Sequence, residues 1–314
     1  NKVFCKTAFQ PLSAEVNGTK KDFGYGTIMI PVADQVMDKD QLQRILQAAV
    51  DATSVPIHSV NTGFSLKGID LGSRNFQTLN LPKVAMLVGD GVSGYEAGEI
   101  WHFMDTRMGM PVTKVETNRF SRLALGNYDV LILVSGRYSN LGDTDIQKIK
   151  EWIRKGGTLI TQRTATQWAI KKELAKATFK ENKAVYPEKI SFGNAREVRG
   201  ARAIGGSVYQ TDIDISHPLA FGYSRSKLPV YRNHSVFVEP TKNPVANVST
   251  YTVNTHLDGY IHAPNLDTLK GTTSLMVSQQ GRGRTILMMD NPNFRGFWYG
   301  TNKLFWNAVF LGGV

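Results

Sequence analysis

The sequence predicts an α/β protein built around a doubly wound, mostly parallel sheet. Its 314 residues are 41% hydrophobic, enough apolar side chains for a large core that needs no disulfide or metal to hold it together. Continuous apolar runs at 84–88 and 130–134 are typical of strands buried on both faces. Segments of helical periodicity alternate with such runs, which indicates a parallel sheet with helices on both sides.

The pattern of residues 1–81 predicts a small βαβ-like segment. Residues 27–31 and 55–60 have the composition of strands. Between them, one helical face is predicted by the spacing of Leu42, Ile45, Leu46 and Ala49. The stretch 61–82 is rich in Gly, Ser and Asn, which favours a connector, so we place a domain boundary after residue 81.

Residues 82–314 predict the main domain. Its expected strands are 84–88, 112–116, 129–134, 158–161 and 285–290. Its expected helices are 97–108, 146–153, 165–177 and 304–309. Between about 185 and 280 the apolar residues instead alternate with a period of two, which is typical of antiparallel strands. We therefore expect a β-rich antiparallel insertion in the sheet, or an extension of it.

Charge and cysteine content exclude several classes of protein. The chain has 37 basic and 26 acidic residues, a net charge of +11, but the basic residues are dispersed and form no recognition motif, so we expect no nucleic-acid partner. Cys5 is the single cysteine, which excludes a disulfide framework and a cysteine zinc site. No apolar run reaches the roughly 18 residues of a membrane span, so we expect no transmembrane segment.

Residues Gly89 to Gly94 match the dinucleotide-binding pattern G-x-G-x-x-G. They follow a buried strand and open a helix, and Glu116 ends the next expected strand, as the pattern requires. Against this interpretation, Asp90 places a carboxylate where two phosphates would sit. Nucleotide binding through this turn remains an alternative.

Several motifs together resemble a known family. They are residues 82–91, 95–102, 105–107, 110–114 and 290–302, the last of which reads Asp-Asn-Pro-Asn-Phe-Arg-Gly-Phe-Trp-Tyr-Gly-Thr-Asn. The chain resembles the C-terminal region of large bacterial zinc carboxypeptidase-like proteins, in which a class I glutamine amidotransferase-like domain follows the peptidase domain. The resemblance covers roughly residues 80–314.

The resemblance carries expectations about fold, partner and location. It implies a flavodoxin-like sheet over residues 82–314, with residues 1–81 as the join to an upstream peptidase domain. That parent would be a metallopeptidase, a zinc-dependent hydrolase, and would be secreted or periplasmic. The chain begins at Asn1 without Met, and we expect it to be a piece of such a longer protein.

The peptidase's zinc motif is missing from this chain. Such enzymes hold zinc with a His-x-x-Glu pair and a distant His, leaving an open position for water. None of the six histidines is followed by Glu three residues later. We therefore expect no metal site and no cofactor here, with zinc only in the absent peptidase domain.

The amidotransferase's catalytic pair is also missing. The resemblance implies a Cys on the turn after a central strand and a His after a later strand; this chain has Arg163 and Asn291 there. A guanidinium is not a nucleophile at neutral pH, and an amide cannot replace a general base. We therefore expect a pseudoenzyme: a non-catalytic accessory domain that binds a peptide or glycan substrate, or supports its own peptidase domain.

Ligands of doubly wound sheets lie beyond the carboxyl ends of the strands. Four loops should converge there: 89–96, 135–139, 162–166 and 290–295. From them we select as candidate binding residues Asp90, Glu96, Arg137, Tyr138, Asn293 and Arg295.

Two other interpretations of these loops stay open. In the first, Asp90 and Glu96 only pair with Arg137 or Arg295 and close the loops. In the second, the domain is a hydrolase or transferase in which Asp90, Glu96 or Asp290 acts as an acid–base group.

Overall fold

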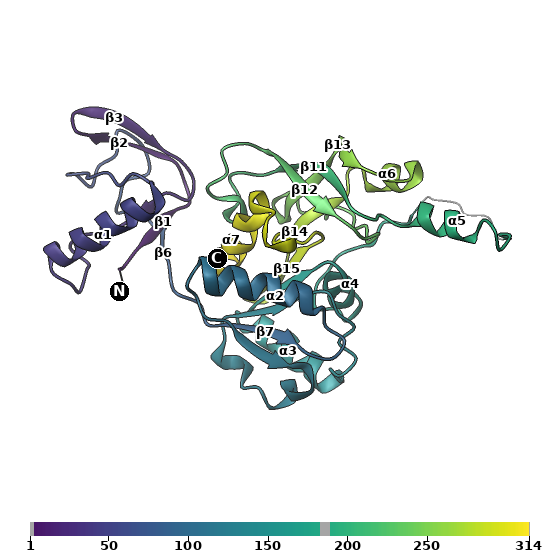
Figure 1. Cartoon of the computed structure of the whole chain (residues 1–314). Coiled ribbons are helices and arrows are strands. Elements are labelled where there is room, and N and C mark those ends of the chain that lie inside the picture. The colour runs from purple at the N-terminus through teal and green to yellow at the C-terminus, as the bar shows by residue number, and fades with distance from the viewer. Residues whose placement is uncertain (1–2, 183–188, 314) are drawn as a thin grey trace. The chain divides into compact units, whose positions relative to one another are not determined.

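The computed structural model describes residues 3–182 and 189–313 and divides the chain into two compact units, Asn1–Leu81 and Pro82–Val314. Figure 1 draws the first in purple to dark blue and the second in the remaining colours. Each unit is described by itself.

The described residues of the unit Asn1–Leu81 form two small antiparallel sheets and one helix. The first sheet has the order β4-β1-β6, with β1 at Lys6–Ala8, β4 at Ile28–Met29 and β6 at Phe76–Thr78. The second has the order β3-β2-β5, with β2 at Leu12–Val16, β3 at Thr19–Phe23 and β5 at Lys67–Gly68. The helix α1 spans Lys39–Thr53, with Asp38 capping its N-terminus.

The predicted βαβ-like arrangement is wrong, because both sheets are antiparallel and residues 55–60 form no strand. Val55 and Ile57 are 61% and 44% exposed, so no apolar layer covers this stretch, and Pro56 has no N–H to donate to a neighbour. The predicted helix is present, but only Leu42 of its expected apolar face is buried.

In the unit Pro82–Val314, nine strands of the described residues form one sheet, in the order β12-β11-β13-β14-β15-β10-β9-β7-β8. Five are mutually parallel: β7 (Val84–Val88), β8 (Thr113–Glu116), β9 (Val130–Leu133), β10 (Thr158–Gln162) and β15 (Gly283–Met288). Numbered along the chain, they lie in the order 2-1-3-4-5, which is the flavodoxin order. The predicted flavodoxin-like, doubly wound fold is confirmed.

The predicted antiparallel segment extends this same sheet beyond β15. Its strands are β11 (Ser207–Ile213), β12 (Lys227–Arg232), β13 (Asn247–Gly259) and β14 (Thr273–Gln280). β12 is the last strand at this edge and carries Lys227 and Pro229, whereas β8 forms the opposite edge.

Helices cover both faces of the sheet because its central strands are apolar on both sides. Along β7, Val84 and Met86 pack in one buried cluster with Ile100 of α2 (Gly94–His102) and Phe305 of α7 (Asn302–Leu311). Ala85 and Leu87 pack in a second cluster with residues of α3 (Asp143–Arg154) and α4 (Thr164–Lys171). Two short helices, α5 (Ala195–Arg202) and α6 (Ala263–Leu269), belong to the antiparallel region.

Candidate ligand-binding cleft

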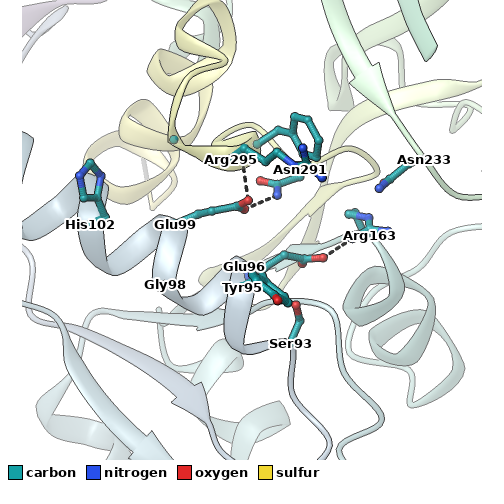
Figure 2. Close-up of a pocket in the computed structure, with 12 residues that line it drawn as sticks. Ser93, Tyr95, Glu96, Gly98, Glu99, His102, Arg163, Asn233, Asn291 and Arg295 are labelled. Carbon is teal, nitrogen blue, oxygen red and sulfur yellow. Dashed lines mark hydrogen bonds and ion pairs between the residues drawn. The ribbon is translucent and has the colours of Figure 1, made fainter. Parts of the chain in front are cut away.

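A cleft of about 830 Å³ opens at the carboxyl ends of β10 and β15, beside α2. Its polar lining includes Glu96, Glu99, Arg163, Asn233, Asn291 and Arg295. Figure 2 shows these side chains approaching one another from α2, the turn after β10, the loop after β15 and, for Asn233, the segment after β12. The cleft lies where ligands of doubly wound sheets bind.

The α2 wall begins at Ser93, whose hydroxyl accepts a hydrogen bond from the backbone N–H of Glu96 at 3.3 Å and so caps the helix. Glu96 and Glu99 lie three residues apart, so their side chains share one helix face. Glu96 is only 3% exposed, and its Oε2 accepts the backbone N–H of Ser135 at 2.8 Å. Its Oε1 forms an ion pair with the guanidinium Nη1 of Arg163.

Loss of the α2 cap should weaken the cleft wall measurably. Ser93→Ala is expected to lower the free energy of unfolding by about 1 kcal/mol, because the Glu96 N–H loses its acceptor. Ser93→Gly should cost only a few tenths of that amount, since water can reach the freed N–H. Urea denaturation measures both, and equal costs for the two variants would contradict the capping role.

Arg163 alone forms the turn between β10 and α4, with φ 48° and ψ −115°. Residues other than glycine seldom adopt positive φ, and such strain concentrates at functional sites. Its backbone N–H donates to the carbonyl of Met288 at 2.9 Å, which locks the turn to β15. Its side chain is 19% exposed, and Nε is buried without a hydrogen-bond partner among the described residues.

The loop after β15 holds Glu99 from the opposite side. The side-chain amide of Asn291 donates to Glu99 Oε2 at 2.5 Å, and the backbone N–H of Arg295 donates to Oε1 at 2.6 Å. Burial raises the pKa of Glu99, although these two hydrogen bonds oppose the rise; the charge of Glu96 adds to it. Arg295 also has positive φ, 50°.

The structure brings two of the six candidate residues, Glu96 and Arg295, into the cleft, together with Arg163 and Asn291. The other four lie outside its lining. Asp90 and Arg137 are exposed on the loops after β7 and β9. Tyr138 is 1% exposed, donates its hydroxyl to the Val134 carbonyl and packs at 5.1 Å from the Trp168 ring.

Asn293, the last of the four, is 1% exposed and accepts a hydrogen bond from Asn302 at 2.9 Å. The interpretation that Glu96 pairs with Arg137 or Arg295 is wrong, because its ion pair is with Arg163. That pair links α2 to the turn after β10 and leaves Arg295 without an ion pair among the described residues.

Sequence reasoning missed several residues of the cleft lining, among them Glu99 and Asn233. Glu99 carried a signal, since it lies one helical turn after Glu96 and therefore shares its face. Asn233 carried none, because it follows β12, whose position depends on long-range antiparallel pairing.

A buried polar network lies directly behind the cleft. Asp290 is 7% exposed; its Oδ2 accepts hydrogen bonds from the hydroxyls of Tyr251 and Ser274, the latter at 2.7 Å, and its Oδ1 lies 3.2 Å from Nη1 of Arg232. Arg232 is 1% exposed and also donates to the carbonyl of Val236. Asp290 is therefore enclosed by its partners and does not line the cleft.

His234 completes this network as a neutral side chain. Its Nδ1 accepts the Val236 N–H at 3.2 Å, and its Nε2 lies 3.6 Å from Asp290 Oδ1. Burial and the charge of Arg232 lower the pKa of His234 from 6.5 to about 4. Burial alone would raise the pKa of Asp290, but His234 and Arg232 outweigh it and hold that pKa below its ordinary value.

Acidification should therefore weaken the fold at this network. Between pH 6.5 and about 4, the unfolded chain binds a proton at His234 that the folded chain does not.

Because Asn233 lies between Arg232 and His234, and Asn291 follows Asp290, the network also fixes the backbone that places two amides in the cleft.

The turn Gly89 to Gly94 has a structural explanation. Gly89 has φ +96°, and a Cβ there would lie 2.0 Å from the carboxylate Oε2 of Glu116. Glycine is favoured there by the positive φ, whereas the exposed, flexible side chain of Glu116 could move away from a Cβ. The conformation of Gly89 thus explains this glycine without a ligand, and the nucleotide interpretation gains no support from it.

Within the part of the chain that the structure describes, no three His, Cys, Asp or Glu side chains gather as a metal site would require. No described helix is both long and apolar enough to cross a membrane.

No protein-family model matches the sequence, and no curated protein matches it. Among solved structures, a chain of PurLQS from Thermotoga maritima is 15% identical, with 73% of this chain and 97% of that chain covered and a TM-score of 0.46. A putative ThuA-like protein from Bacteroides uniformis is 13% identical, with coverages of 72% and 89% and a TM-score of 0.44. A glutamine amidotransferase from Thermotoga maritima is 12% identical, with coverages of 68% and 77% and a TM-score of 0.41. Similarity at this level does not indicate a function.

Proposed function

We propose that residues 82–314 form a non-catalytic ligand-binding domain of a larger, zinc carboxypeptidase-like protein. The observation that carries the proposal is Arg163, which occupies a strained strand-to-helix turn and points its guanidinium toward the cleft. Such a turn exposes one side chain at the top of a sheet, where enzymes place a nucleophile. A guanidinium at this point can bind a ligand but cannot attack it.

The other side chains of the cleft support binding rather than turnover. Asn291 stands where the resemblance implies a base, and its amide donates to Glu99 and accepts the backbone N–H of Asn293. Glu96 is occupied by Arg163 and by the Ser135 N–H. The polar groups are thus fixed in place before a ligand arrives, which lowers the entropic cost of binding.

The test measures turnover by the purified chain with glutamine, peptides and peptide esters. We expect the native chain to show no turnover that depends on Arg163 or Asn291, so Arg163→Ala and Asn291→Ala should behave as the native chain does. Arg137→Ala is the matched control, since this arginine is exposed outside the cleft. Turnover that is abolished by a cleft variant but kept by the control would overturn the proposal.

A parent peptidase is part of the same proposal, and it rests on the sequence motifs. If it is right, the complete reading frame encodes an upstream domain with His-x-x-Glu and a distant His, behind an export signal. This upstream domain would then be the natural partner of the chain.

A second candidate function is a hydrolase that uses Glu96 and Glu99. The favouring observation is that two carboxylates share the cleft and that burial raises the pKa of Glu99, as a general acid requires. This candidate predicts hydrolysis of an ester or glycoside that Glu99→Gln abolishes, whereas the binding proposal predicts no turnover in the native chain or the variant.

A further inference from the structure

We propose that the cleft binds an oxyanion, a carboxylate or phosphate group, between the side chains of Arg163 and Arg295. This inference rests on the proposed binding function and names the chemistry of its ligand. Four independent features of the described residues carry it: backbone strain, free donors, an aromatic support and the charge balance of the cleft.

The two arginines are held in a backbone conformation that disfavours them. The non-glycine residues with positive φ in the described structure are Asn17, Ser54, Tyr138, Arg163, Glu173 and Arg295. Only two of these are arginines, and both line this one cleft. Glycine would adopt either conformation without strain. We infer that the interactions of the two guanidinium groups in the cleft offset this backbone strain.

Arg163 presents a free pair of donors. Glu96 takes Nη1, and Glu96 is itself held by the Ser135 N–H, so the guanidinium plane is oriented. Nε and Nη2 remain as the adjacent pair that binds two oxygens of a carboxylate or phosphate side by side. Nε is buried and has no partner among the described residues, so a ligand oxygen there would satisfy an orphaned donor.

Arg295 supplies the second cation from the facing loop. Its backbone N–H is fixed by Glu99, and its guanidinium carbon lies 5.4 Å from the ring centroid of Phe294. Phe294 in turn stacks on Tyr231, with centroids 3.7 Å apart. The guanidinium thus rests on an aromatic support and forms no ion pair with described residues, which leaves its charge available.

The charge balance of the cleft favours an anion most when Glu99 is protonated, because Arg163 and Arg295 together balance the charges of Glu96 and Glu99. The groups around Glu99 are Glu96 and His102 on α2, Arg163 after β10 and Arg295 after β15. Burial already raises the pKa of Glu99, and a bound anion would raise it further. Binding should therefore take up protons and become tighter as the pH falls toward the pKa of Glu99.

The experiment is isothermal titration calorimetry of the full chain with inorganic phosphate, glutarate and neutral glutaramide. We expect phosphate or glutarate to bind and glutaramide not to bind; the better of the two anions identifies the source of the oxyanion. Arg163→Gln and Arg295→Gln should each weaken binding about tenfold or more, because each loses charge-assisted hydrogen bonds. Arg137→Gln, outside the cleft, is the matched control and should bind as the native chain does.

Arg163→Lys keeps a positive charge at neutral pH but loses the paired donors, so it should bind weakly and provides the test if Arg163→Gln fails to fold. Titrations in two buffers of different ionisation enthalpy should show proton uptake that decreases in Glu99→Gln. Binding of glutaramide alone, no binding of either anion, or anion binding unchanged in both arginine variants would overturn the inference while leaving a binding domain possible. Turnover that depends on Arg163 would instead overturn the proposed function.

Discussion

Replacing Asp290 with alanine is expected to lower the free energy of unfolding by about 3–5 kcal/mol, the usual cost of breaking a buried ion pair. The physical reason is that Arg232, only 1% exposed, keeps its charge in the interior without a counterion. The hydroxyls of Tyr251 and Ser274 lose their shared acceptor as well. Urea denaturation of the full chain, followed by tryptophan fluorescence, measures the change.

The matched control for this prediction is an exposed ion pair in the same sheet. Asp212 and Lys227 lie 2.8 Å apart with side chains about half exposed, so Asp212→Ala should cost no more than about 1 kcal/mol. The double variant Asp290→Leu with Arg232→Met should be more stable than Asp290→Ala, because it removes both charges. Equal midpoints for Asp290→Ala and Asp212→Ala would refute the role of the network.

Phe305→Ala is expected to lower the free energy of unfolding by about 3–5 kcal/mol, the range for deleting a buried aromatic ring. Phe305 is fully buried on α7 and packs edge to face on Phe103, with centroids 6.0 Å apart. Phe103 begins the π-helical turn Phe103–Arg107 that directly follows α2. The cavity would therefore also loosen the anchoring of the helix that carries Glu96 and Glu99.

The control for Phe305 is Phe192, which is 98% exposed and should tolerate alanine with little change in the urea midpoint. Phe305→Leu should be less destabilising than Phe305→Ala, because the leucine side chain fills part of the cavity that alanine would leave. If Phe305→Ala unfolds at the same urea concentration as Phe192→Ala, the packing of α7 against the turn Phe103–Arg107 is not what stabilises this unit.

The sequence predicted the main fold well because its central strands are apolar on both faces. A run such as Val84–Val88, apolar at every position, is typical of a strand whose two faces are both covered by helices. The same reasoning failed at residues 55–60, where an apolar composition is not matched by any covering layer and the side chains stay exposed. Local pattern indicates a strand only where neighbours exist to pair with it.

The candidate site was predictable only where it depends on the ends of parallel strands. Glu96, Arg163, Asn291 and Arg295 all follow such ends, which converge in any doubly wound sheet. Asn233 depends on the pairing of β12 with β11 far along the chain, which no local pattern reveals. Tyr138 also follows a strand end, but its bulky ring packs into the core at positive φ instead of facing ligand.

The two edge strands of the nine-stranded sheet, β12 and β8, affect the tendency of separate molecules to aggregate. On β12, Pro229 removes one backbone donor in mid-strand and exposed Lys227 brings a charge. On β8, Lys114 and Glu116 are exposed charges on a strand of four residues. Short, charged or proline-interrupted margins resist strand addition from another molecule. This broad sheet is thereby protected from edge-to-edge aggregation at both sides.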